Sequence, residues 1–111
     1  WLDTDGDPKT GWQGFDYRVN RTVRSSRATV LERWTAQGWQ PQSDIALRVS
    51  GKELMVQIPR DQVGLADAAR PIRLHIKWAD NLQKDDDTDE FMLNGDTAPN
   101  CRFTYLYAQE P

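Results

Sequence analysis

The chain has 111 residues, a formal net charge of -3 and 38% hydrophobic residues. This length suits one domain around one hydrophobic core, so we expect a single domain over residues 1–111. The acidic balance disfavours nucleic acid as a partner, and no apolar run is long enough to span a membrane. The lone Cys101 excludes an internal disulfide and is expected to be a buried or half-buried apolar residue.

Alternating apolar and polar residues predict strands along most of the chain. The segments with this pattern are residues 15–20, 29–35, 45–49, 53–58, 72–78 and 103–107. A glycine turn at residues 50–52 separates the third and fourth segments and indicates a hairpin. Short helical turns are expected within residues 60–69 and 87–93. The sequence therefore predicts an all-β, antiparallel, jelly-roll-like β-sandwich with one or two short helical turns.

An acidic loop near the start of the chain is the strongest chemical signal. Asp3, Asp5 and Asp7 alternate with small residues, and Gly6 allows the backbone to turn. Carboxylates that converge in such a loop favour a hard cation such as Ca²⁺, which usually takes about six to eight oxygen ligands. Asp16, on the outward face of the next predicted strand, can return to the same point. These four aspartates are the predicted metal ligands.

The spacing of this loop differs from that of an EF-hand, because Pro8 and Gly14 occupy the positions where that motif needs Gly and Glu. A second acidic run, over residues 84–90, is compatible with another cation or with a solvated loop.

Catalysis by paired carboxylates is not expected. Glycosidases place two carboxyl groups roughly 5–10 Å apart across a cleft, with one in an apolar pocket. Here the acids crowd together in polar, Gly-rich loops. The only histidine, His75, lies beside no Ser or Cys motif and is expected to be a half-exposed strand residue. We therefore expect a protein that is not an enzyme.

Five tryptophans are many for a chain of this length. Sugar rings stack on exposed aromatic side chains that are flanked by amides or charges. Trp12 beside Gln13 lies in a Gly-bounded segment, and Trp39 beside Gln40 lies in residues 38–42 after a glycine. Both segments read as loops, so these four residues are candidate ligand contacts. The same two indoles are equally suited to capping the ends of a core.

Two further tryptophans are ambiguous. Trp34 lies on a predicted strand and suits either a binding platform or the core. Trp78 shares a strand face with three apolar residues, which favours the core or its edge, but it is also kept as a candidate ligand contact. The remaining strand aromatics and their neighbour are expected in the core: Phe15, Tyr17, Val19, Phe103, Tyr105 and Tyr107.

Residues 1–17, read as WLDTDGDPKTGWQGFDY, resemble the "DTD…TG(W/Y).G.D(Y/F)" segment of family 9-like carbohydrate-binding modules and the wider DOMON-like sandwiches. Residues 53–65, 76–81 and 94–103 resemble later segments of the same group. The resemblance implies a β-sandwich with a structural calcium at Asp3, Asp5, Asp7 and Asp16, and Trp12 as a ligand contact. It also implies extracellular use beside a polysaccharide-degrading catalytic domain.

The combined expectation is a non-catalytic carbohydrate-binding module, stabilised by calcium, that binds plant β-glucan chains such as cellulose or hemicellulose. Trp12, Trp34, Trp39 and Trp78 would stack on sugar rings, with Gln13 and Gln40 beside them. We expect it to be secreted as part of a longer enzyme with an appended glycoside hydrolase domain. The alternatives are a structural or adaptor sandwich that packs against a catalytic domain, and a hydrolase fragment.

Overall fold

The computed structural model describes residues 1–110, and antiparallel strands dominate it. The main sheet has seven strands in the order β5-β4-β3-β2-β1-β6-β9. These strands are β1 (Leu2–Asp3), β2 (Tyr17–Val23), β3 (Ala28–Thr35), β4 (Gly38–Ser50), β5 (Glu53–Gln57), β6 (Arg73–Ile76) and β9 (Tyr105–Ala108). A two-stranded sheet pairs β7 (Trp78–Asp80) with β8 (Asp96–Ala98).

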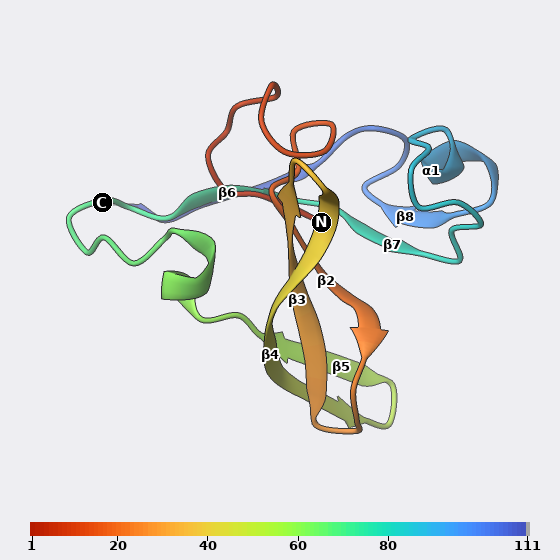
Figure 1. The fold of residues 1–111 in the computed structure, drawn as a ribbon, viewed down its shortest axis with the longest axis horizontal. Coiled ribbons are helices and arrows are strands. Elements are labelled where there is room, and N and C mark those ends of the chain that lie inside the picture. Colours follow the sequence, from red (N-terminus) through yellow and green to blue (C-terminus); the bar gives the residue numbers. More distant parts are fainter. Residues whose placement is uncertain (111) are drawn as a thin grey trace.

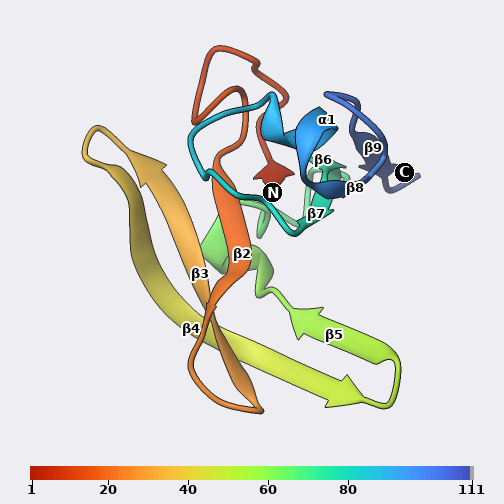
Figure 2. The same ribbon diagram turned by 90° about the vertical axis from the view of Figure 1, so that its right-hand side faces the viewer.

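The sheets curl into a half-barrel, with 46% of the residues in strands. Figure 1 shows β2, β3 and β4 crossing β6 and β7, and Figure 2 shows the β4–β5 hairpin reaching away from the rest of the sheet. The helical turns are a 3-10 helix, η1 (Arg60–Val63), and one α-helical turn, α1 (Glu90–Leu93). The predicted all-β, antiparallel, sandwich-like class with short helical turns is confirmed.

Strand β4 begins earlier than the sequence suggests. Residues 38–42 were expected to form a loop around Trp39, but Trp39 pairs with Trp34 across a tight hairpin between β3 and β4. Pro41 lies opposite Glu32 where the register of the two strands shifts. Since proline has no N–H for the ladder, such an irregularity accommodates it inside a strand.

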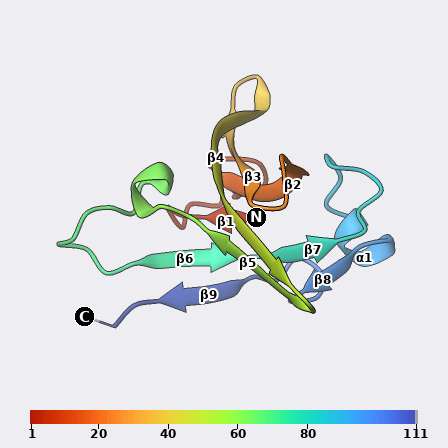
Figure 3. The same ribbon diagram turned by 90° about the horizontal axis from the view of Figure 1, so that it is seen from below.

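The predicted strand over residues 72–78 is divided at Lys77. Its N–H donates to Trp1 O at 2.9 Å, and its carbonyl accepts from Trp1 N at 2.8 Å. The chain therefore stays extended, and Figure 3 shows β6 and β7 end to end. The division arises because β6 pairs with β9 whereas β7 pairs with β8.

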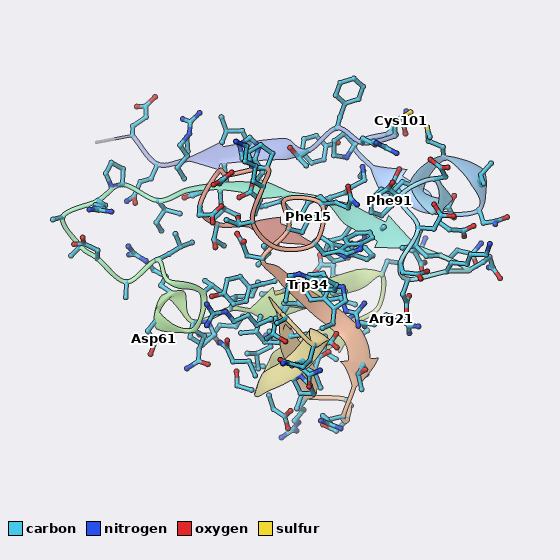
Figure 4. All side chains as sticks on the ribbon, turned by 45° about the horizontal axis from the view of Figure 1, so that its top comes forward. Phe15, Arg21, Trp34, Asp61, Phe91 and Cys101 are labelled. Atoms are coloured by element: carbon cyan, nitrogen blue, oxygen red, sulfur yellow. The ribbon has the colours of Figure 1, made fainter. Side chains whose placement is uncertain are left out.

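The core has two parts. One contains Leu2, Tyr17, Leu31, Ile45 and Val63. The other is an aromatic cluster, labelled in part in Figure 4, whose members are Trp12, Phe15, Phe91 and the partly buried Trp1, Trp34, Trp39, Ala79 and Leu82. The expected burial of Phe15 and Tyr17 is confirmed, and Val19 is half-buried against the first part.

Several residues expected inside are exposed instead. Trp78, Phe103, Tyr105 and Tyr107 each expose half or more of their surface, and Cys101 lies on the outside (Figure 4). Alternation along a strand fixes which face a side chain takes, but it does not show whether another element covers that face. Here β9 is an edge strand. None of the helices among residues 1–110 has both the length and the apolar character needed to cross a membrane.

Candidate functional site

The structure brings together three of the four predicted metal ligands. Carboxylate oxygens of Asp3, Asp5 and Asp16 lie within 4.8 Å of one another. Asp3 ends β1, and Asp16 precedes β2. The two segments are joined by the hydrogen bond from Asp16 N to Leu2 O (2.8 Å) and by that from Thr4 N to Asp16 Oδ2 (2.8 Å). The expectation that Asp16 returns to the loop agrees with this geometry.

Thr10 ties the acidic loop together. Its hydroxyl oxygen lies 2.7 Å from Asp5 Oδ2 and 3.2 Å from Asp16 Oδ1. Gly11 has a φ of 64°, and a Cβ there would lie 2.0 Å from Phe15 O, so only glycine fits this close approach. Asp7 remains outside the group, because its exposed carboxylate accepts a hydrogen bond from Lys9 N at 2.9 Å.

The crowding of carboxylates affects their titration. Partial burial and the nearby charges of Asp16 and Asp5 raise the pKa of Asp3, against the hydrogen bond from Gly6 N. Burial also disfavours the charge of Asp5, but the hydrogen bonds from Thr10 and from Asp7 N outweigh it and lower the pKa of that carboxyl. All three donors are hard oxygen ligands, which suits a cation such as Ca²⁺.

The predicted sugar platform does not form as expected. Trp12 is only 8% exposed and packs against Phe15, Trp39 and Phe91, so its ring faces are not open to a ligand. This burial corrects the prediction of an exposed loop tryptophan. Trp34 and Trp39 meet edge to face with ring centroids 5.4 Å apart, and both are half-buried in the aromatic cluster.

The remaining predicted contacts are scattered. Gln13 and Gln40 are exposed, and Gln40 Nε2 lies 3.4 Å from Gln37 O. Trp78 is 53% exposed, but it alternates with Ala79, which packs into the aromatic cluster, so it lies on the opposite face of β7. The six predicted ligand residues therefore do not converge on one site.

A cavity of about 310 Å³ lies between β2 and the segment that follows β7, and we call it the Arg18 cavity. It is lined by Trp1, Arg18, Val19, Asn20, Arg21, Ala79, Asp80, Asn81, Leu82 and Asp85.

Arg18 is a buried cation, and one of its three guanidinium nitrogens makes no hydrogen bond in the described part of the chain. Its Nε and Nη2 donate to the two carboxylate oxygens of Glu32, at 2.6 and 3.0 Å. Its guanidinium carbon lies 4.9 Å from the centre of the Trp39 ring. The third nitrogen, Nη1, is buried and has no hydrogen-bond partner among the described residues. A buried donor without a partner is costly, and it needs an explanation in the structure.

Trp1 supplies a second unpartnered donor. Its ring lies edge to face against Phe91, with centroids 5.5 Å apart, and its buried Nε1 has no partner in the described part of the chain. Trp39 Nε1 is also buried and unpartnered, but Trp39 does not line the cavity. The Arg18 cavity is therefore bordered by two side chains that each retain a free N–H.

The rest of the lining contains one ion pair and one further carboxylate. Arg21 makes hydrogen bonds of 2.8 to 3.1 Å to both carboxylate oxygens of Asp85, whose proximity raises the pKa of Arg21. Asp80 Oδ1 accepts from Asn81 N at 2.7 Å. The cavity therefore combines unsatisfied donors with carboxylate acceptors, an arrangement that suits a neutral ligand carrying hydroxyl groups.

A larger cavity of about 570 Å³ lies between the acidic loop and residues 64–75. Its cationic lining, Arg70 and Arg73, is solvent-exposed, and it contains none of the unpartnered buried groups. The Arg18 cavity is thus the better candidate for a ligand-binding site.

Sequence reasoning missed Arg18, Trp1 and Asn20. An Arg on one strand and a Glu on the next carry no spacing signal, because their pairing depends on the register of β2 and β3. Asn20 has a φ of 65°, and its Oδ1 accepts from Thr29 Oγ1 at 2.8 Å, which the alternation of the strand does not suggest. Comparisons with protein-family models, curated proteins and solved structures find no match.

Proposed function

We propose that the protein is a non-catalytic carbohydrate-binding module that holds a sugar in the Arg18 cavity. The observation that carries this proposal is that Arg18, whose buried Nη1 lacks an acceptor, is one of the residues that line the cavity. A ligand oxygen placed there would satisfy a donor whose unmet hydrogen bond costs on the order of 1–3 kcal/mol. The indole N–H of Trp1 offers the same opportunity to a second oxygen.

The electrostatics favour a neutral ligand over an anion. Glu32 already compensates the charge of Arg18, and Asp85 compensates that of Arg21, so Asp80 is left as a carboxylate without an ion pair in the lining and disfavours an anion. Sugar hydroxyls accept hydrogen bonds from Arg18 and Trp1 and donate to the carboxylate of Asp80. A volume near 310 Å³ lies at the lower end for ligand pockets, which suits one sugar ring better than a long segment.

The ligand class that we propose is plant β-glucan, including cellulose and hemicellulose chains, in line with the family resemblance of the acidic loop. The same resemblance supports a secreted protein that works beside a glycoside hydrolase domain. Stacking on Trp12 is not part of this proposal, because Trp12 is buried.

Calcium is proposed to stabilise the acidic loop without taking part in sugar binding. The support is the chemistry of the donor set, since Asp3, Asp5 and Asp16 present oxygen atoms within 4.8 Å of one another. A divalent cation there would offset both the partial burial and the neighbouring negative charges that raise the pKa of Asp3.

A second candidate is a structural or adaptor domain that packs against a neighbouring domain. It is favoured by the exposed Trp78 on β7 and by Tyr105 and Tyr107 on β9, which form apolar surface away from the Arg18 cavity. In that case the aromatic side chains would be interface residues.

Affinity electrophoresis on soluble β-glucans tests the proposal. A carbohydrate-binding module migrates more slowly in a gel containing its glucan than in a gel without polymer, whereas an adaptor domain migrates equally in both. Unchanged mobility across mixed-linkage glucan, xyloglucan and a soluble cellulose derivative would reject the first candidate. A non-binding protein of similar size and charge serves as the mobility standard.

A further inference from the structure

Strand β9 forms one edge of the seven-stranded sheet, and residues 103–108 carry no charge. Natural proteins usually protect an edge strand with charged residues, proline or a covering element. The opposite edge, β5, follows this rule, since it begins at Glu53 directly after Lys52. Strand β9 is only four residues long, and it contains neither a charged side chain nor a proline. We propose that two copies of this chain associate through their β9 strands.

The backbone of β9 is available for pairing. Gln109 N donates to Ile72 O at 2.8 Å, and the register places Tyr107 opposite Leu74 and Tyr105 opposite Ile76. In an antiparallel ladder, alternate residues point their N–H and C=O groups to opposite sides. The odd-numbered residues of β9 therefore bond to β6, and the main-chain groups of Leu106 and Ala108 point away from the sheet.

The side chains around this edge are apolar and open. Tyr105, Leu106 and Tyr107 expose 57%, 47% and 51% of their surface. Tyr105 lies opposite Ile76 in register, and alternation through the extended Lys77 places Trp78 on the same face as these two residues. An aromatic surface therefore continues from β9 onto β7.

The chain exposes more accessible surface than a compact monomer of its mass, and the difference exceeds one partner's share of a standard interface. The accessible surface is 7675 Å², whereas a compact monomer of 12.8 kDa exposes about 6,300 Å². The excess, roughly 1,400 Å², is more than the ~800 Å² that each partner contributes to a standard interface. This excess leaves room for an interface, and the uncharged β9 edge is suited to pairing with an identical strand.

A two-fold axis perpendicular to the sheet at Leu106 gives a complementary arrangement. Antiparallel pairing then sets Leu106 opposite its own copy and Tyr105 opposite the partner's Tyr107. The pairs bring no like charges together and place aromatic side chains across from one another, an arrangement that stabilises a sheet. The paired strands would extend one sheet across both chains, and the Arg18 cavity would remain outside the interface.

Sedimentation equilibrium of the 111-residue chain tests this proposal, with two substitutions in β9 and one control. Leu106→Pro removes an N–H that points away from β6, and Leu106→Lys places like charges across the two-fold axis. Val49→Lys changes another exposed apolar residue, near the end of β4, and serves as the matched control. Circular dichroism melting identifies any variant that fails to fold, and Leu106→Lys then decides the outcome if Leu106→Pro unfolds.

The expected result is a mass of twice 12.8 kDa for the wild type and for Val49→Lys, and a mass of one chain for both Leu106 variants. A monomeric wild type at every concentration would overturn the proposal. It would also be overturned by folded Leu106 variants that remain dimeric, or by loss of the dimer in Val49→Lys.

Discussion

Arg18 and Glu32 lie directly opposite each other on β2 and β3, and two hydrogen bonds join their side chains. Both residues are buried, with 8% and 6% of their surface exposed. The two-pronged contact fixes the plane of the guanidinium group, and the Trp39 ring lies 4.9 Å from its centre. One ion pair therefore holds two strands together and orients the remaining nitrogen, Nη1, which carries the proposed binding function.

Replacing Arg18 alone is expected to damage folding. Arg18→Met leaves the Glu32 carboxylate buried without its partner, which should lower the free energy of unfolding by about 3–5 kcal/mol. The double variant Arg18→Met with Glu32→Leu removes both charges and should recover most of this loss. Urea unfolding measures both effects. The double variant should fold but should not bind glucan, because it lacks Nη1. Glucan binding by this stable double variant would show that Nη1 has no role.

The second free donor of the cavity can be removed with little change in shape. Trp1→Phe keeps an aromatic ring against Phe91 but deletes the Nε1–H. The loss of one neutral hydrogen bond should weaken glucan binding roughly two- to tenfold in calorimetric titration. Trp12→Phe is the matched control, because Trp12 is a buried indole of the same aromatic cluster that does not line the cavity. Equal affinities of the two variants would argue against a sugar at Trp1.

Calcium and acidity should act on the loop through Asp3. Since the pKa of Asp3 is raised in the folded protein, the folded state binds this proton more tightly than the unfolded chain does. Without metal, its contribution to stability therefore falls as the pH rises above the ordinary pKa of an aspartate, about 3.9. Asp3→Asn should raise the melting temperature in EDTA at neutral pH and abolish stabilisation by calcium.

Asp7→Asn is the control for that experiment, because Asp7 lies outside the group of converging carboxylates. Calorimetric scans with EDTA and with calcium should show the wild-type calcium response in this variant. A calcium response that persists in Asp3→Asn, or that is missing from the wild type, contradicts the proposed metal site.

Lys77 is expected to restrain the loop that carries Cys101. The side chain is 1% exposed, and its Nζ donates to Pro99 O at 2.7 Å and to Phe103 O at 2.9 Å. Burial lowers the pKa of this amine, and no carboxylate pairs with it among the described residues. Lys77→Met leaves both carbonyls without their donor, so the loop should open more often.

Limited trypsin digestion should then cut after Arg102 severalfold faster in Lys77→Met than in the wild type, as followed by mass spectrometry. Lys84→Met is the control, because Lys84 is exposed. If both variants are cut at the wild-type rate, Lys77 does not restrain the loop.

The sequence predicts local structure well wherever neighbouring residues decide it. The hairpin over β4 and β5 follows from alternating residues on both sides of Gly51, and the convergence of Asp3 and Asp5 follows from their spacing in a turning loop. The helical turn after Pro59 was predicted for similar reasons. It ends at Gly64, whose φ of 71° favours glycine.

Long-range packing decides the rest, and the sequence does not encode it in any local pattern. Trp12 sits in a Gly-bounded segment that reads as an open loop, yet the hydrogen bonds between Trp12 and Phe15 fold it back onto the aromatic cluster. Trp78 has the alternation of a core residue but lies on a face that no described element covers. The pairing of Arg18 with Glu32 depends on strand register, so the candidate cavity appears only in three dimensions.

The indole N–H resonances of the five tryptophans give the most direct test of the binding site. They can be observed in a nitrogen–proton correlation spectrum during titration with a cello-oligosaccharide, and Trp1→Phe assigns the resonance of interest. We predict a saturable shift of the Trp1 resonance, with that of Trp12 nearly unchanged. Saturable shifts confined to Trp78, or the absence of any shift at saturating sugar, would contradict binding in the Arg18 cavity.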